Sequence, residues 1–314
     1  MFNKLGSFNR RTFMQVAGGA CIANAIRPAL AESTSTGHLP LRMGVVVWVE
    51  EGKSIDDAVR DAHAMGFQTC QIGFERLTPA VLKPLKAALE KYEIKGTAFS
   101  EHGPGERVFD FYRGPKTIGI VPRPLREARI NNLKMAADMA AACGIPHIHT
   151  HCGFTPEDPN HPLYPETVAA MKKIAIYCKD RGISFLCETG EETPITLRRM
   201  IEDVGTGNVF VNFDPANIVM CGKGNPVDAM EVLGPLVRGT HAKDGFLPTS
   251  TRQFGEEVAI GKGKVDFPTI FKQLRQANYQ GPITIEREID GPERIKDILQ
   301  SKAYLEDLLR KTYQ

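Results

Sequence analysis

Four polar residues in the second half of the chain each follow a short apolar run. They are Glu188 in "FLCETG", Asp214 in "VNFDPAN", His241 in "RGTHAKDG" and Glu286 in "ITIERE". A buried carboxylate without a partner costs several kcal/mol or takes up a proton. Three carboxylates gathered at one point would repel one another, whereas a divalent cation between them favours their ionised forms. We therefore predict that these four residues bind a metal ion together.

The donor set indicates which ion to expect. Three carboxylates and one imidazole suit Mn²⁺ best, with Mg²⁺ or Co²⁺ as further candidates and Zn²⁺ less suited. We expect one such ion per chain. Taken singly, each of the four residues could be a structural acid or histidine at a strand end. Their common position at the ends of successive apolar runs favours a shared metal site.

Elements that could bring these residues together are visible as apolar runs of strand length alternating with amphipathic runs of helix length. Continuous apolar runs indicate a parallel sheet covered on both faces. About eight such β-then-α units predict a single-domain (β/α)8 TIM barrel, whose C-terminal strand ends carry the chemistry. An open doubly wound sheet is the alternative, but no G-x-G-x-x-G follows the first strand. The expected strands are residues 42–49, 67–74, 94–100, 147–151, 183–188, 209–214, 237–242 and 282–287, and helical stretches include 54–66, 128–144, 166–182 and 267–281.

The first 31 residues have the layout of a twin-arginine export signal. The pair Arg10–Arg11 precedes a mildly apolar run, and the segment closes on Ala29, Leu30 and Ala31, an A-x-A cleavage pattern. The apolar run, residues 14–26, is too short and too rich in glycine and alanine for a transmembrane helix. We predict a signal peptide over 1–31, a barrel domain over 32–314, and a periplasmic or otherwise exported protein without a stable membrane anchor. A basic N-terminus with a chance arginine pair is the alternative.

Composition and charge place the chain among ordinary globular proteins. Of its 314 residues, 42% are hydrophobic and 24% are charged. The formal net charge is +2, and residues 1–31 contain four basic residues and no acidic one, so their removal leaves −2. This balance argues against a nucleic-acid partner. We expect a small-molecule substrate, and a homo-oligomer stays open.

The cysteines do not form a recognisable motif. Six of the seven lie beyond residue 31, and none shows C-x-x-C spacing. Most fall in apolar patterns, so buried free thiols are expected. Disulfides could form in an exported protein, but the spacing selects no pairing.

Several segments together carry a family resemblance. They are "CETGEETP", "NFDPAN", "HAKDG" and "GKGKVDFPTIFKQLRQANYQGPITIERE". The chain resembles the xylose-isomerase-like superfamily of sugar isomerases and epimerases over nearly all of residues 32–314. This resemblance implies a TIM barrel and places Glu188, Asp214, His241 and Glu286 on the family's metal site. It also implies that Glu188 and Glu286 serve as acid/base groups on opposite faces of the substrate.

Two positions depart from the ketose 3-epimerases of that superfamily. Those enzymes have a histidine where this chain has Asn217, and a substrate-binding arginine where it has Lys243. We expect both residues in the substrate site, and both changes argue against an ordinary free ketose. With the export signal, the pattern resembles a branch linked to inositol and oxidised-sugar catabolism, whose wider membership acts on ketoses, inososes or 3-keto-glycosides.

Further substrate-binding candidates lie at the ends of the earlier strands. His149 and His151 alternate onto the same face of residues 147–151, and His151 is preferred because it is nearer the C-terminal end. His102 in "FSEHGP" and Trp48 in "VVWVE" stand where a sugar ring or hydroxyl could rest. Each of the three could instead have a packing role. The glycines of "GKGKVDF" are interpreted as a turn before a helix capped by Asp266.

We predict that these residues catalyse a reaction that passes through an enediolate intermediate. A metal ion polarises a sugar carbonyl while one carboxylate removes the adjacent proton. Return of the proton from the opposite face gives epimerisation, and return to the neighbouring carbon gives isomerisation. Loss of a β-substituent gives elimination, so a dehydratase or lyase is the second hypothesis. A phosphodiesterase of the AP-endonuclease type and a non-catalytic sugar-binding protein are two further hypotheses, and the charge of −2 opposes the former.

Overall fold

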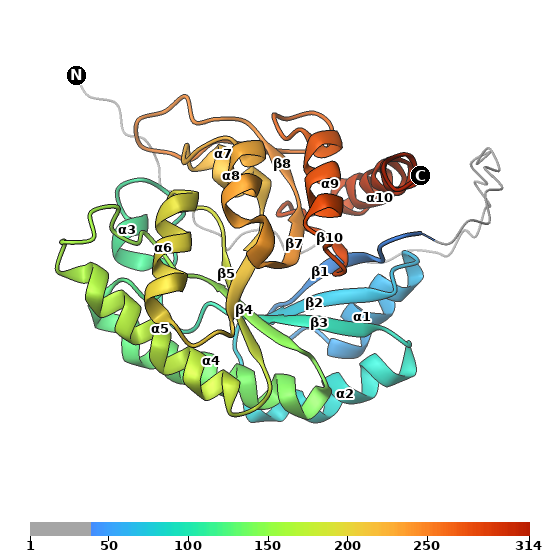
Figure 1. Ribbon diagram of the computed structural model, residues 1–314. Coiled ribbons are helices and arrows are strands. Elements are labelled where there is room, and N and C mark those ends of the chain that lie inside the picture. Colours follow the sequence, from blue (N-terminus) through green and yellow to red (C-terminus); the bar gives the residue numbers. More distant parts are fainter. Residues whose placement is uncertain (1–38) are drawn as a thin grey trace, which may run out of the picture. The chain divides into compact units, whose positions relative to one another are not determined.

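Residues 39–314 form a closed barrel of eight parallel strands in a computed structural model (Figure 1). The predicted signal peptide, residues 1–31, lies outside these described residues. Around the barrel the strands follow the order β1, β10, β7, β6, β5, β4, β3, β2, so neighbours in sequence are neighbours in space. The prediction of a (β/α)8 TIM barrel is confirmed. The strands are β1 (Met43–Val49), β2 (Thr69–Phe74), β3 (Lys95–Ser100), β4 (His147–His151), β5 (Ser184–Glu188), β6 (Val209–Phe213), β7 (Val237–Ala242) and β10 (Ile283–Ile285).

Helices follow the strands and surround the barrel (Figure 1). A two-stranded antiparallel sheet, β8 (Asp244–Gly245) with β9 (Glu257–Val258), is inserted after β7. No helix of the described residues is long and apolar enough to cross a membrane. The helices are α1 (Ile55–Ala64), η1 (Pro79–Val81), α2 (Leu82–Lys91), α3 (Gly114–Thr117), α4 (Arg123–Cys143), α5 (Leu163–Lys179), α6 (Pro194–Val204), α7 (Pro215–Met220), α8 (Pro226–Leu233), η2 (Gly234–Leu236), α9 (Phe267–Gln276) and α10 (Pro292–Thr312).

Local sequence explains where the helices begin and end. In α9, buried residues recur at helical spacing, and the Asp266 side chain accepts a hydrogen bond from the Thr269 backbone, as the predicted cap requires. Helix α4 starts at Arg123, earlier than the apolar pattern indicated, because Pro124 is tolerated in a first helical turn. It ends at Cys143, and the capping residue Gly144 has a positive φ of 67° that suits glycine.

The interior of the barrel is built in layers of four side chains taken from alternate strands. One of these layers, the middle layer, consists of Gln71, His149, Asn212 and Thr284. Strand register pairs each of its residues with one residue of the next layer toward the C-terminal strand ends: Gln71 with Val46, His149 with Ser100, Asn212 with Glu188, and Thr284 with His241. The middle layer (Gln71, His149, Asn212, Thr284) is buried and entirely polar. TIM barrels usually fill such positions with branched apolar residues. The polar side chains therefore need a reason beyond filling the core.

Candidate active site at the C-terminal end of the barrel

The four predicted ligands lie on four neighbouring strands. Glu188 ends β5, Asp214 follows β6, His241 lies in β7 and Glu286 follows β10. One donor atom from each residue can be chosen so that all four lie within 4.8 Å of one another. Their side chains are at most 13% exposed. The barrel thus brings together the residues that the strand-end pattern selected.

Asp214 provides the test of whether this set fits a metal ion. Its Oδ1 accepts a hydrogen bond of 2.9 Å from the Asn217 backbone at the start of α7. Its Oδ2 has no hydrogen-bond partner among the described residues, although Asp214 is fully buried. Burial raises the pKa of Asp214, which shows how costly its negative charge is in this position. Lys243 Nζ lies 3.8 Å from this oxygen, outside hydrogen-bond distance. A buried oxygen without a hydrogen-bond partner, beside two carboxylates and an imidazole, fits a hard divalent cation.

His241 stands at the centre of the carboxylates. Its Nδ1 lies 2.9 Å from Glu188 Oε1, 3.1 Å from Glu286 Oε2 and 3.7 Å from Asp214 Oδ2. Burial by itself lowers the pKa of His241, but Glu286 and Glu188 outweigh it and raise this pKa well above its usual value. The site therefore attracts positive charge at Nδ1.

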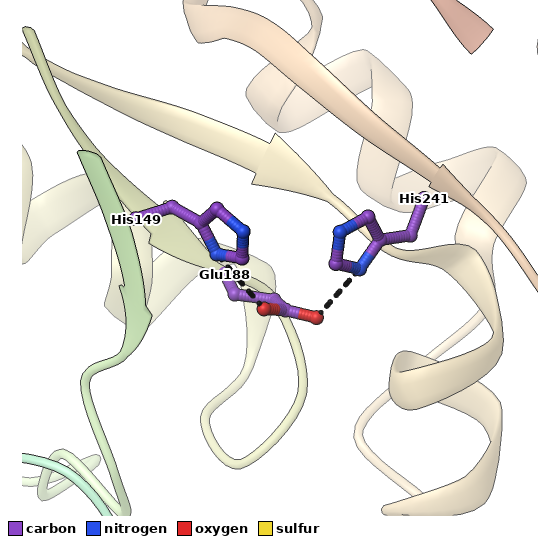
Figure 2. A group of neighbouring side chains, drawn as sticks. All are labelled: His149, Glu188 and His241. Atoms are coloured by element: carbon purple, nitrogen blue, oxygen red, sulfur yellow. Dashed lines mark hydrogen bonds and ion pairs between the residues drawn. The ribbon is translucent and has the colours of Figure 1, made fainter. Parts of the chain in front are cut away.

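A second histidine lies beside Glu188. Figure 2 shows His149 and His241 on either side of Glu188, and His149 Nδ1 lies 3.2 Å from Glu188 Oε2. These three residues form another group of potential ligands. Burial lowers the pKa of His149, so a neutral ring is favoured. His149 belongs to the middle layer and is fully buried, whereas His151, the preferred candidate, borders a cavity.

The cavity above the ligands has two lobes that share Phe109, His151 and Glu288. The first lobe, of about 300 Å³, reaches Glu188 and Glu286. Trp48 and His102 line it, as expected of substrate-binding candidates. The ring centroids of Trp48 and His102 are 5.5 Å apart, as are those of His102 and His151. This lobe therefore has a carboxylate floor and an aromatic wall.

The second lobe, of about 210 Å³, contains Asn217 and Lys243. Lys243 Nζ lies 3.0 Å from Glu286 Oε2 and is almost completely buried. Burial by itself lowers the pKa of Lys243, but nearby carboxylates, first Glu286, raise it well above its usual value. Asn217 Nδ2 donates a hydrogen bond of 3.2 Å to Glu188 Oε1. Both predicted substrate residues thus border the cavity and also contact the predicted ligands.

Sequence reasoning missed two residues of this region. Glu191 lies 3.0 Å from His151 Nδ1, and its carboxylate, with Glu188, outweighs burial and raises the pKa of His151 to about 10. Gln71 contacts His241 from β2. The repeated acids of "ETGEETP" and the amides of Gln68 and Gln71 within the expected strand 67–74 were the available indications. Neither indication specifies a partner, because both partners are set by the barrel.

The expectation for the cysteines is confirmed for the described residues. All six cysteines among them are free, and five of them are buried. Burial raises the pKa of Cys70 and of Cys178 to about 12, so these thiols stay protonated.

The family is established by comparison. Residues 59–308 match the family described as "Xylose isomerase-like TIM barrel". This match extends over most of the chain and includes all four predicted ligands. The chain therefore belongs to that family.

Characterised relatives are distant. An L-ribulose 3-epimerase from Methylomonas sp. is 27% identical over 153 residues, 46% of this chain and 48% of the relative. An inosose dehydratase from Clostridium botulinum is 24% identical over 136 residues, 38% of this chain and 45% of the relative. The chain thus matches less than half the length of either enzyme.

Solved structures match over a greater length. A xylose isomerase domain protein from Planctomyces limnophilus has a TM-score of 0.79 at 30% identity, covering 87% of this chain and 99% of that one. A 3-keto-D-glucoside 4-epimerase from E. coli has a TM-score of 0.62 at 18% identity, covering 85% and 100%. The second similarity concerns the fold alone.

Proposed function

We propose that the protein is a divalent-metal-dependent sugar isomerase or epimerase acting on a ketose or an oxidised sugar of the inosose or 3-keto-glycoside class. The observation that carries this proposal is the convergence of donor atoms from Glu188, Asp214, His241 and Glu286 within 4.8 Å, beside a cavity of about 300 Å³. The names of the relatives, which include a sugar epimerase and an inosose dehydratase, support the same class of substrate.

These four residues would hold one ion, with Mn²⁺ the best match to the donors and Mg²⁺ or Co²⁺ also suitable. When bound, such an ion polarises a substrate carbonyl and stabilises negative charge that develops beside it. The Asp214 and His241 side chains are the purely ligating members of the set. Glu188 and Glu286 also border the cavity, so they can both ligate and move protons.

Proton transfer is assigned to Glu188 and Glu286. They come from β5 and β10, which two other strands separate, so they approach the cavity from different sides. Burial by itself raises the pKa of Glu286, but His241 and Lys243 outweigh it and hold this pKa below its usual value. For Glu188, His151 and His241 likewise outweigh burial and lower the pKa. Both carboxylates are therefore ionised near neutral pH, and either can remove a proton next to the carbonyl.

Elimination of water is the second candidate, and His151 favours it. The Glu191 carboxylate lies 3.0 Å from His151 Nδ1 and orients the ring. His151 Nε2 lies 3.6 Å from Glu188 Oε2 at the cavity wall. An imidazolium in this position could donate a proton to a departing hydroxyl group. A base and an acid on the same cavity are what a dehydratase requires.

A phosphodiesterase and a non-catalytic sugar-binding protein have less support. Among the described residues, the two groups of potential metal ligands share Glu188 and His241, so neither adds a separate second ion site for a phosphodiesterase. A sugar-binding protein would not require four converging metal ligands.

Solvent exchange tests the proposal. Metal-loaded protein would be incubated in D₂O with a panel of ketoses, inososes and 3-keto-glycosides and followed by NMR. Deuterium at the carbon beside the carbonyl with a stereoisomer as product is expected for the epimerase. Loss of water from an inosose would establish the dehydratase. Phosphodiester cleavage without any carbon-acid exchange would overturn both.

Export is a separate proposal that rests on residues 1–31 alone. If Arg10 and Arg11 form a twin-arginine signal, replacing both by lysine should leave unprocessed precursor inside the cell. N-terminal sequencing of the exported wild type should begin near Glu32. Unchanged export of the double variant would contradict the proposal.

A further inference from the structure

Two buried amides connect His241 with the far side of the barrel. His241 Nε2 lies 2.8 Å from Gln71 Oε1, and Gln71 Nε2 donates a hydrogen bond of 3.0 Å to Asn212 Oδ1. Gln71 is 1% exposed, Asn212 is 0% exposed and His241 is 2% exposed. The three side chains come from β2, β6 and β7, and β2 lies opposite β6 in the barrel order. The contact is therefore made only when the barrel closes.

Hydrogen-bond complementarity fixes how the His241 ring is used. Its Nδ1 faces the carboxylates, and its Nε2 faces the amide oxygen of Gln71. A neutral imidazole that offers a lone pair at Nδ1 has its hydrogen on Nε2. That hydrogen needs an acceptor, and Gln71 Oε1 is the acceptor that the structure provides.

Asn212 offers an acceptor to the NH₂ group of Gln71 in the orientation in which the Gln71 oxygen faces His241. If the amide were reversed, its NH₂ group would point at Nε2, which would then have to accept, and the ring hydrogen would lie on Nδ1. In the structure Asn212 Oδ1 accepts from the Gln71 NH₂ group while the Gln71 oxygen is directed at the ring, so both ends of the Gln71 amide have a partner. Space for Asn212 depends on Gly239, where an added Cβ would lie 2.4 Å from Asn212 Oδ1.

We propose that Gln71 is a positioning residue that holds His241 in the tautomer whose Nδ1 lone pair faces the cation site, with Asn212 accepting a hydrogen bond from the other end of the Gln71 amide. The inference rests on the proposed function in that it takes Glu188, Asp214, His241 and Glu286 as the cation site. It gives a chemical role to two members of the polar middle layer, which a packing role alone would fill with apolar side chains.

Affinity for Mn²⁺, measured by isothermal titration calorimetry, is the first test. Gln71→Leu removes the acceptor and should weaken Mn²⁺ binding by roughly 10–100-fold, as loss of hydrogen-bond partners of metal-binding histidines does. Gln71→Glu keeps an oxygen acceptor and should bind Mn²⁺ at least as tightly as wild type. Asn212 can reverse its amide to meet the new carboxylate, because Asn212 Nδ2 has no partner among the described residues.

Thr284→Val is the matched control. Thr284 lies in the same buried layer, pairs in register with His241, and has a hydroxyl without a hydrogen-bond partner among the described side chains. The substitution changes the layer without removing a bond to a predicted ligand. Mn²⁺ affinity should therefore stay within about 2-fold of wild type, because Thr284 makes no hydrogen bond to a predicted metal-binding histidine whose loss would weaken the site.

The tautomer itself can be observed by ¹⁵N NMR of histidine-labelled protein loaded with diamagnetic Mg²⁺. Wild type should show a His241 signal with the hydrogen on Nε2, assigned by its absence in His241→Asn. Gln71→Leu should lose this single-tautomer pattern, and Gln71→Glu should restore it. If Gln71 acted only through packing, Gln71→Glu would not restore the single-tautomer signal of His241.

The outcomes separate the two proposals. If wild type binds Mn²⁺ while Gln71→Leu binds it equally well with an unchanged tautomer, the role of Gln71 is overturned and the proposed function stands. If wild type binds no ion, both proposals are overturned.

Should Gln71→Leu fail to fold, Asn212→Leu and Asn212→Asp replace it. The leucine variant should weaken Mn²⁺ binding, and the aspartate variant, which still accepts from Gln71, should retain it. Equal affinities in these two variants would overturn the inference.

Discussion

The two halves of the barrel's C-terminal end differ in chemistry. Strands β5, β6, β7 and β10 provide the four predicted ligands, all acidic or imidazole, packed within 4.8 Å. Strands β1 to β4 and the loops after them provide the aromatic wall, with Trp48, His102 and His151 in a row. The difference suggests that one half binds the ion and moves protons, while the other shapes the substrate cavity. Substitutions in the two halves should therefore alter different measured quantities.

The largest effect is expected from Asp214→Ala. Both Asp214 and Asp266 cap a helix through a side-chain oxygen, so Asp266→Ala is a matched control. Loss of either cap should cost about 1 kcal/mol of stability. Only Asp214→Ala should also lose most of the bound ion and the rise in Tm that Mn²⁺ produces in wild type. Metal analysis and thermal unfolding with and without Mn²⁺ measure both. Full ion retention in Asp214→Ala would remove Asp214 from the site.

Glu286→Gln should lower turnover by roughly 10²–10⁴-fold, because glutamine keeps an oxygen ligand but cannot act as a base. Some ion binding should remain. Glu288→Gln is the control, since Glu288 also contacts Lys243 but lies outside the ligand group. It should change turnover far less. Steady-state kinetics measure the turnover of both variants on the substrate identified by solvent exchange. Equal losses of turnover in the two variants would contradict the assignment of Glu286 as a base.

Glu101, a buried carboxyl on the other half, should respond to pH in the opposite sense to Glu188 and Glu286, whose pKa values are lowered. Glu101 follows β3, and burial raises its pKa from 4.5 to about 8 although Asn132 and the Phe74 backbone donate hydrogen bonds to it. Because the folded-state pKa is raised, the carboxyl contributes stability that is complete below about pH 4.5 and is lost as pH rises through about 8.

Glu101→Gln should remove this pH dependence. Relative to wild type, the variant should gain on the order of 4 kcal/mol of unfolding free energy between pH 5 and pH 9. Urea unfolding at several pH values measures the difference. A difference that does not change with pH would show that Glu101 is not protonated in the folded protein.

The smallest effect is expected from Trp48→Ala on the aromatic wall. The indole packs over Gly73, where an added Cβ would lie 2.3 Å from the ring. Its loss should raise KM by about 10-fold, equivalent to about 1.4 kcal/mol of binding, while Mn²⁺ affinity stays unchanged. Trp48→Phe should retain most of the binding. Loss of Mn²⁺ affinity in Trp48→Ala would erase the distinction between the two halves.

Much of the fold and site was predictable because it depends on local patterns. Apolar runs followed by amphipathic segments indicated the strands and helices, and their parallel order placed Glu188, Asp214 and Glu286 at one end of the barrel. Asn217 and Lys243 were expected near the substrate, and both border the cavity. Their contacts with Glu188 and Glu286 were not predicted, since these contacts depend on side-chain directions across neighbouring strands.

The amino-acid sequence by itself determined the order of the elements, the family and the four residues that gather at the strand ends. The order of the elements and the strand-end residues follow from periodicity along the chain, which every segment carries locally, whereas the family follows from the resemblance of its motifs. Tertiary structure alone decided that Gln71 meets His241, 170 residues away in the chain. Closure of the barrel sets β2 opposite β6 and brings the buried amides of Gln71 and Asn212 into hydrogen-bond distance. No local pattern contains that pairing, because it depends on the register of all eight strands.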